Sequence, residues 1–258
     1  AQATELALSG LVPGLEYHLY MDSLENHTTG FADEAGTLAW TQDLVESHLI
    51  FIQTVPSTYL IADEENGKEC TQIGDWDAGS KTCTLTTDVP TAIEIQSSGI
   101  TLDGAGHTMS GSSSLTAGVN IPSAGNTKTN VTVKNLIIDG FKNGIYLADA
   151  KDCEIRGNTI MNASNNGIQL FAKGKDVAVD NIVTGNQILN SPYGIYAMRD
   201  ANIFQRNTVR NTTYALDGNI LGSFHNNNLI GNQYLANSLK GQTLSAGLPF
   251  GGNYWSSF

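Results

Sequence analysis

The stretch that decides the fold is Gly144-Ile145-Tyr146-Leu147, because it recurs along the chain. It returns as Gly167-Ile168-Gln169-Leu170 and as Gly194-Ile195-Tyr196-Ala197. Gly118-Val119-Asn120-Ile121 precedes them, and the steps between the glycines are 26, 23 and 27 residues. Ala215-Leu216 continues the series, and a second apolar element follows each copy from Gly144 onward: 155–160, 183–188, 204–209 and 224–229. Short apolar alternations with this period, punctuated by Gly and Asn, predict the coils of a parallel β-helix. The Leu framework of leucine-rich repeats is missing.

Alternation within each short strand assigns the side chains to two faces. We expect Ile145 and Leu147 to stack in a narrow core, with Tyr146, Gln169 and Tyr196 facing outward. The other inward pairs are Ile168/Leu170, Ile155/Ile160 and Val183/Ile188. At the bends, stacked amides can bond from coil to coil. The predicted ladder consists of Asn158, Asn186, Asn207 and Asn227, with Leu136 and His107 in the corresponding slots of earlier coils.

Charge separates a first region from the coils. Residues 1–90 hold 15 acidic and two basic residues, whereas residues 91–258 hold ten and eleven. Asparagine shows the reverse, with two before residue 100 and twenty-two after it. The first region reads as short strands in a small antiparallel sheet, with a turn at 26–30. The expected strands are Glu5–Leu11, Glu16–Met21, Thr37–Thr41 and Ser47–Ile52. We therefore predict an all-β chain: an acidic sheet module at 1–52, a disulfide-stapled cap segment at 53–90 and a parallel β-helix at 91–258.

Three stretches carry a resemblance to a known class. They are Ile100–Met109, the Gly-Ile-Tyr-Leu and Gly-Asn-Thr-Ile repeats, and Gly252-Asn253-Tyr254-Trp255-Ser256. The chain resembles right-handed parallel β-helix proteins of the pectin lyase-like, NosD-type class over roughly residues 58–258. Residues 70–76 with 82–86 also resemble the segment that leads into some of these helices. The resemblance implies the fold but not the activity, because the class includes lyases, hydrolases, epimerases, adhesins and envelope proteins.

Three cysteines allow one disulfide. Cys70 and Cys83 enclose a turn-rich segment and are the predicted pair, two unpaired thiols being the alternative. Cys153 falls on an inward position and is expected to be a small core residue. A disulfide indicates an oxidising compartment, and four sequons for N-linked glycosylation agree with export. These sequons begin at Asn26, Asn130, Asn162 and Asn211.

Catalytic candidates are scattered. Outward carboxylates on adjacent coils could serve a glycosidase, and a basic group could serve a polysaccharide lyase. For most of the acids, a solvated loop surface explains the composition better. The carboxylates are Asp139, Asp149, Asp152, Asp180 and Asp200, and the basic group is Arg199, Arg206 and Arg210 with His225. The paired-Asp motif of polygalacturonases and the Asp-Pro-His-Asp of alginate epimerases are absent.

No cofactor is expected. Calcium would suit the hard oxygens of Asp63-Glu64-Glu65 and Asp75-Trp76-Asp77, although exposed acidic loops are the commoner explanation. NosD relatives suggest copper, but four Met and five scattered His form no cluster of soft ligands.

The chain is predicted to be a secreted, non-catalytic structural protein of the cell surface, forming a head-to-tail homopolymer or joining other envelope components. The alternative is a carbohydrate-active enzyme or a glycan-binding module. A net charge of −12 argues against a nucleic-acid partner, and no apolar run could span a membrane. The chain starts without Met and reads as a mature chain without its leader. The residues expected in assembly are Leu6 and Leu8 on a strand free to pair, and Phe250, Tyr254, Trp255 and Phe258 near the C-terminal end.

Overall fold

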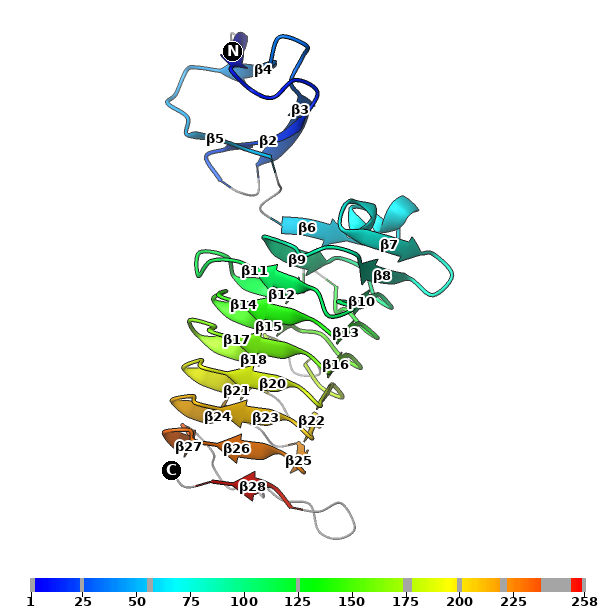
Figure 1. Cartoon of the computed structure of the whole chain (residues 1–258), viewed down its shortest axis with the longest axis vertical. Helices are drawn as coiled ribbons and strands as arrows, with labels where there is room; N and C mark the ends of the chain where they lie inside the picture. Colours follow the sequence, from blue (N-terminus) through cyan, green and yellow to red (C-terminus); the bar gives the residue numbers. More distant parts are fainter. Residues whose placement is uncertain are drawn as a thin grey trace. The chain divides into compact units, whose positions relative to one another are not determined.

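The computed structural model describes residues 3–23, 26–54, 58–123, 126–173, 178–198, 201–218, 222–237 and 252–256. The chain divides into two compact units, Ala1–Ser57 and Thr58–Phe258. The fold is all-β: a right-handed parallel β-helix preceded by a small antiparallel module, as predicted (Figure 1).

The first unit contains two small antiparallel sheets. Strand β1 (Ala3–Ser9) pairs with β4 (Thr37–Asp43), and β2 (Glu16–Met21) lies between β3 (His27–Phe31) and β5 (Ile50–Gln53). The turn predicted at 26–30 was wrong, because most of this stretch is strand β3. Gly30 serves close packing there: a Cβ atom at this position would lie 2.7 Å from Leu38 Cδ1. The small core of this unit is formed by Tyr17, Leu19, Ala32 and Leu38.

The second unit winds three short strands per coil, so that three sheets run along the helix; their strands pair in parallel, except that β7 pairs antiparallel with β8. The first sheet consists of β6 (Thr58–Ile61), β9 (Ala92–Ile95), β12 (Ala117–Ile121), β15 (Asn143–Ala148), β18 (Asn166–Phe171), β21 (Tyr193–Ala197), β24 (Tyr214–Gly218) and β27 (Tyr234–Ala236). The second consists of β7 (Gly74–Asp77), β8 (Thr82–Leu85), β10 (Thr101–Asp103), β13 (Thr132–Lys134), β16 (Glu154–Arg156), β19 (Ile182–Thr184), β22 (Ile203–Gln205) and β25 (Ser223–His225). The third consists of β11 (Thr108–Ser110), β14 (Ile137–Asp139), β17 (Thr159–Met161), β20 (Gln187–Leu189), β23 (Thr208–Arg210), β26 (Asn228–Ile230) and β28 (Tyr254–Trp255).

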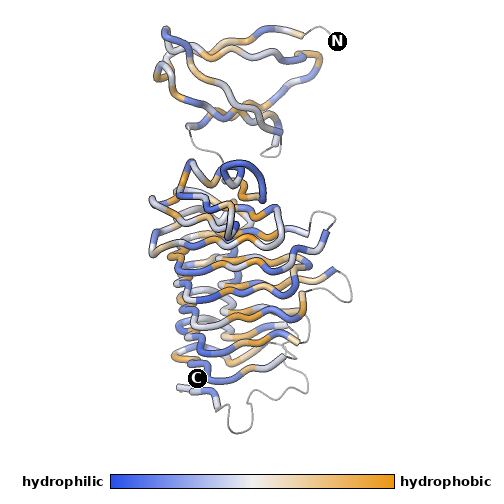
Figure 2. The backbone as a smooth tube through the Cα atoms, turned by 90° about the vertical axis from the view of Figure 1, so that its right-hand side faces the viewer, coloured by the Kyte–Doolittle hydropathy of each residue, from blue (hydrophilic) through white to orange (hydrophobic). Residues whose placement is uncertain are grey.

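Register aligns like residues in the core. Ile145 pairs with Ile168, Leu147 with Leu170, and Ile155 with Val183. Each of these side chains is fully buried, in line with the inward positions assigned from the sequence. Figure 2 shows hydrophobic segments that recur at the same place in successive coils. Burying one large apolar side chain stabilises the folded state by about 1.5–3 kcal/mol, and the sum of these terms is the main stabilising contribution of such a core.

The bend between the second and third sheets explains the Gly-Asn pattern. In each of four coils, one residue there has a positive φ, and the residue that follows it points inward and belongs to the predicted asparagine ladder. The positive φ falls on Gly157 and Gly185 in two coils, and on Arg206 and Asn226 in the next two. Glycine adopts this conformation without the steric cost of a Cβ atom.

A cap covers the first coil. It contains the short 3-10 helices η1 (Glu65–Gly67) and η2 (Cys70–Gln72). Leu60 N donates to Glu69 Oε2 at 2.6 Å, and Glu69 N donates back to Leu60 O at 3.1 Å. These bonds occupy the edge of β6 that β9 leaves unpaired, and an occupied edge cannot template pairing with another chain.

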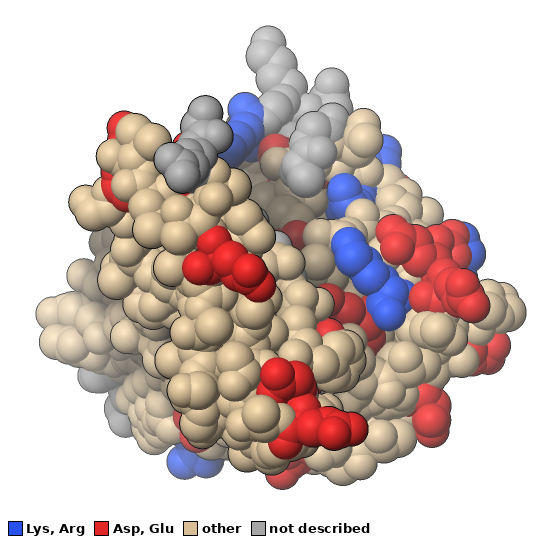
Figure 3. All heavy atoms as spheres, turned by 90° about the horizontal axis from the view of Figure 1, so that it is seen from above, with Lys and Arg blue, Asp and Glu red and all other residues tan. Residues whose placement is uncertain are grey.

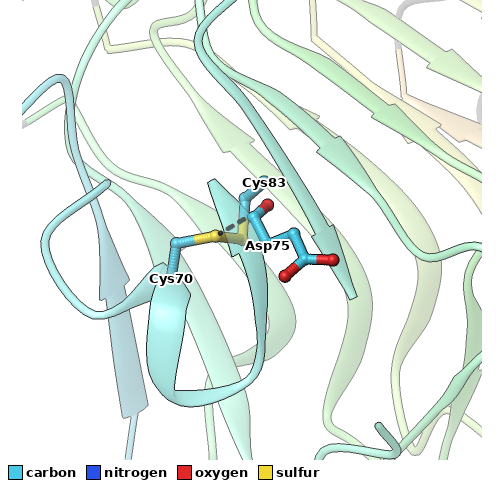
Figure 4. Close-up of a disulfide and its surroundings, with 3 residues drawn as sticks. All are labelled: Cys70, Asp75 and Cys83. Carbon is cyan, nitrogen blue, oxygen red and sulfur yellow. Dashed lines mark hydrogen bonds between the residues drawn. A yellow bond between two sulfur atoms is a disulfide. The ribbon is translucent and has the colours of Figure 1, made fainter. Parts of the chain in front are cut away.

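The predicted disulfide joins Cys70 and Cys83, whose Cα atoms are 5.8 Å apart (Figure 4). The Asp75 carbonyl oxygen lies 3.5 Å from Cys70 Sγ. Both cysteines are fully buried. The bond therefore ties η2 to β8 of the second sheet.

Candidate functional site

The four predicted ladder residues form one buried column of amides. Asn186 Oδ1 accepts hydrogen bonds from the backbone N and the Nδ2 of Asn158, both at 3.0 Å. Asn207 does the same for Asn186, and Asn227 for Asn207. Each Nδ2 also donates to a backbone carbonyl; that of Asn186 reaches Ile155 O at 2.8 Å. A buried network of uncharged groups in which every donor and acceptor has a partner stabilises the fold and fixes the register of neighbouring coils.

The column extends beyond the four residues at both ends. Leu136 lies in the preceding slot, where its backbone N donates to Asn158 Oδ1 at 3.0 Å. His107 lies in the slot before it, since Ile137 N donates to His107 O. Asn253 continues the column at the other end by accepting from Asn227 N at 2.9 Å. Sequence reasoning missed Asn253, although Gly252-Asn253 repeats the Gly-Asn pattern of the ladder.

Further asparagine columns were also missed. Asn181 and Asn202 form a buried pair: Asn181 Nδ2 donates to Asn202 Oδ1 at 3.1 Å, and Asn181 Oδ1 accepts from Cys153 N. A surface column links Asp139, Asn162, Asn190 and Asn211. These columns depend on which turns stack, so single-coil patterns did not reveal them.

The sequon asparagines Asn26, Asn130, Asn162 and Asn211 are all exposed. Asn162 Nδ2 donates to Asp139 Oδ1 at 2.8 Å, and Asn211 Nδ2 to Asn190 Oδ1 at 3.4 Å. The nitrogen that a glycan would occupy is thus part of the surface column at two of the four sites.

Apart from one pair, the described carboxylates proposed for catalysis lie at different places on the coils. Asp139 is the last residue of β14 in the third sheet. Asp149 follows β15 in the first sheet, and its Oδ1 accepts a hydrogen bond from Lys173 N at 2.6 Å. Asp152 and Asp180 occupy equivalent exposed turns of adjacent coils, each at positive φ and each followed by a buried residue. Asp200 lies outside the described residues.

The basic group is not assembled by the part of the chain that the structure describes. Arg199 lies outside it. Arg206 is exposed at the bend after β22, and Arg210 ends β23 in the third sheet. His225 is buried at the end of β25, with Nδ1 3.0 Å from Ser223 Oγ.

The acidic segments proposed for calcium are engaged in local contacts. Asp63 pairs with Lys81 at 2.5 Å. Asp77 accepts from Ser80 Oγ at 2.7 Å and from Gly79 N at 2.9 Å. The Ser80 hydroxyl and these backbone bonds lower the pKa of Asp77 below its usual value. Within the described residues, no three His, Cys, Asp or Glu side chains are grouped to hold a metal ion.

The residues proposed for assembly are divided between the two units. Leu6 is half-buried and Leu8 is exposed on β1, which pairs with β4 along its whole length, so one edge of β1 is occupied. The expectation that this strand is free to pair with another chain stays a prediction. Tyr254 and Trp255 form β28 and are exposed. Phe250 and Phe258 lie outside the described residues.

The outward face of the first sheet carries a continuous row of polar and aromatic side chains. We call it the outer row: Glu94, Asn120, Tyr146, Gln169, Tyr196 and Asp217. All six are half-buried. Burial, and then the negative charge of a nearby aspartate, raise the pKa of both tyrosines: Asp149 acts on Tyr146 and Asp217 on Tyr196. The sequence predicted three of these residues to face outward but did not reveal the row.

The chain matches the family model described as "Periplasmic copper-binding protein (NosD)" over residues 49–258, and it therefore belongs to that family. The suspected class is thereby confirmed. Neither the search of curated proteins nor that of solved structures found a match. Within the described residues, the structure has no helix that is long and apolar enough to cross a membrane.

The residues present do not fit a copper site. Cys70 and Cys83 are joined to each other, and burial raises the pKa of the Cys153 thiol to about 11. Met109 is fully buried in the core. His48 pairs with Asp22 at 2.7 Å, and His107 lies 3.3 Å from Asp88. Soft donors that could hold copper are thus separated from one another among the described residues.

Proposed function

We propose that this chain is a non-catalytic structural protein outside the cytoplasm that assembles with copies of itself at the cell surface. The family to which it belongs is described as periplasmic, and the disulfide favours an oxidising compartment. The coils are held by buried amide columns and an apolar core, a construction suited to a rigid building block.

One observation supports assembly above the rest. The large hydrophobic side chains that are exposed in the described residues belong either to the first unit or to the last coil of the second unit. In the first unit they are Leu8, Val12, Leu15, Phe31, Leu44, Val45, Leu49 and Phe51; in the last coil they are Tyr234, Tyr254 and Trp255. Exposed apolar groups that gather in this way mark interaction surfaces.

A contact between the last coil of one copy and the first unit of the next would be heterologous, and heterologous contacts generate rings or filaments. Pairing between the β-helices alone is opposed at the first coil, where the cap occupies the edge of β6. Acidic side chains form several separate patches on the face shown in Figure 3. Like charges repel, so we expect the contact to be made by the exposed apolar groups and not by these patches.

The test compares two double variants of the full chain by light scattering and electron microscopy across a concentration series. Phe31→Ser with Val45→Ser changes the first unit, and Tyr254→Ser with Trp255→Ser changes the last coil. We expect the unmodified chain to polymerise and each double variant to stay monomeric. Tyr196→Ala, on the flank of the coils, is the matched control and should polymerise normally. A full chain that stays monomeric at high concentration, with and without calcium, would overturn the proposal.

A further inference from the structure

Three tyrosine rings form a column where the last strands of the first sheet begin. Tyr193, Tyr214 and Tyr234 are Cα partners on β21, β24 and β27. The ring centroids of Tyr193 and Tyr214 lie 5.5 Å apart, and those of Tyr214 and Tyr234 lie 5.1 Å apart, with interplanar angles of 11° and 25°. Both separations fall in the range at which aromatic rings attract each other. The column is therefore an ordered stack, fixed by the register of the strands.

The stack ends in an open ring at the last coil. Tyr193 and Tyr214 are half-buried, whereas Tyr234 is 48% exposed. Strand β27 is the last strand of the first sheet in the described part of the chain, so no described strand lies along its outer edge (Figure 1). Paired strands lie about 4.8 Å apart, close to the 5.1 Å between the last two rings. A strand added to β27 would thus bring an aromatic side chain within stacking distance of Tyr234.

The first unit offers an edge strand with a matching side chain. Strand β3 lies at one edge of its three-stranded sheet and β5 at the other. Phe31 is the last residue of β3 and, at 66%, the most exposed aromatic side chain among the described residues. Phe51 on β5 is 47% exposed, and Tyr254 and Trp255 belong to the last coil itself. Phe31 is thus the ring best placed to cover Tyr234 of another copy.

Charge favours a first unit as the partner of the last coils. Residues 1–57 hold eight acidic residues and neither lysine nor arginine, whereas residues 201–258 hold three basic residues and one acidic residue. Opposite charges on two surfaces speed their encounter and orient it. Two first units would repel each other. Charge therefore favours head-to-tail encounter of two copies, while the contact itself is made by apolar groups.

We propose that β3 of one copy adds to β27 of the next copy, and that the Phe31 ring continues the tyrosine stack. This inference rests on the assembly proposed above and names the two strands that carry it. Pairing gives hydrogen-bond partners to the backbone groups of both open edges, and stacking removes both rings from water. Because the joint connects different surfaces of identical chains, each copy added leaves one β3 and one β27 open for the next.

The first experiment tests which strands meet. The photo-crosslinking residue benzoylphenylalanine replaces Phe31 in the full chain, and a mixture of isotopically light and heavy copies is irradiated under assembling conditions. Mass spectrometry should find links from position 31 to β27 of another copy. The same replacement at Phe51, on the opposite edge strand, is the matched control and should give no link to β27. Polymers that form without the expected link would overturn the inference and leave the assembly proposal standing.

The second experiment measures the critical concentration for assembly by light scattering. Tyr234→Ala should raise it about fivefold, the loss expected for one aromatic pair. Tyr234→Phe keeps the ring and should leave it unchanged, as should Tyr196→Ala on the flank of the coils. Thermal unfolding followed by circular dichroism checks that the variants remain folded. An unchanged critical concentration for Tyr234→Ala would overturn the inference, whereas a full chain that never assembles would overturn the assembly proposal and this inference with it.

Discussion

At the scale of single residues, the asparagine ladder replaces bonds that no backbone partner could make. Each bend breaks the regular pairing between coils, and an inward Asn side chain accepts the backbone N–H of the residue one coil earlier. A buried donor left without such a partner costs about 1–3 kcal/mol. The ladder therefore makes tight bends compatible with a dry interior.

Replacing Asn186 by Leu tests this argument. The change removes the acceptor used by Asn158 N and Asn158 Nδ2, and it removes donors to Ile155 O and Asn207 Oδ1. We expect the free energy of unfolding to fall by about 1–3 kcal/mol, measured by urea denaturation. Gln187→Leu, at the exposed neighbouring position, should change it little. An unchanged midpoint for Asn186→Leu would mean that leucine fills this slot as well as it does at position 136.

The bend before Asn207 predicts a stabilising change. Arg206 has φ of 56° where the two preceding coils use Gly157 and Gly185. Arg206→Gly relieves a steric cost of about 1–2 kcal/mol, less about 0.4–1 kcal/mol for the greater freedom of the unfolded chain. The net expectation is a rise of roughly 0.5–1 kcal/mol in the free energy of unfolding. Arg210→Gly, in strand β23, is the control and should destabilise. A lower melting temperature for Arg206→Gly would show that the arginine side chain contributes contacts of its own.

At the scale of elements, the cap and the coils are stabilised differently. The coils repeat the same sheet pairing, whereas the cap relies on short 3-10 helices, a few edge bonds and one disulfide. Closing a loop of this length contributes about 3 kcal/mol in the chain-entropy model. The cap should thus be the part of the second unit most sensitive to reduction.

Reduction of Cys70–Cys83 is expected to loosen residues 58–90 while the later coils stay protected. Hydrogen exchange followed by mass spectrometry measures this directly, with β15 and β18 as internal references. The Cys70→Ser, Cys83→Ser double variant should reproduce the effect without reductant. Equal loss of protection throughout the second unit would instead make the cap the nucleus on which all coils depend.

How far the sequence predicts each element depends on how local the determining interactions are. Coils such as β15 and β18 could be predicted because their inward pattern repeats within a few residues. Strand β3 could not be predicted, because glycine is required at position 30 by close packing against Leu38 on another strand. The outer row could not be predicted either, because its members become neighbours only through the register of the strands. Glu94 thus pairs with Asn120, and Asp217 with Tyr196. Loops of varying length hide that register in the sequence.

At the scale of the whole molecule, the family description and the distribution of side chains point in different directions. The family is described as copper-binding. In this chain the sulfur and imidazole groups are spread over both units: His18 and His48 belong to the first, and Cys153 and His225 to the second. A tight copper site needs several such donors to converge on one point. The same coils instead gather tyrosines and amides on one face.

The free thiol of Cys153 is the group most able to bind copper, so its state predicts whether the folded chain takes up the metal. Cys153 is buried, and burial raises its pKa to about 11, so the thiolate that copper requires is rarer than in an ordinary cysteine and is enclosed by the core. We expect the folded chain to retain no equivalent of Cu(I) after desalting. Unfolding in urea exposes Cys153 and restores an ordinary thiol, so the same chain should then react with Cu(I) and with a thiol-labelling reagent; Cys153→Ser removes both reactions. Because the folded pKa is raised, native labelling should accelerate as the pH rises toward 11. One equivalent of copper held by the folded chain and by Cys153→Ser alike would show that histidines or methionines converge on a site, and the assignment of this chain as a surface protein without copper would have to be abandoned.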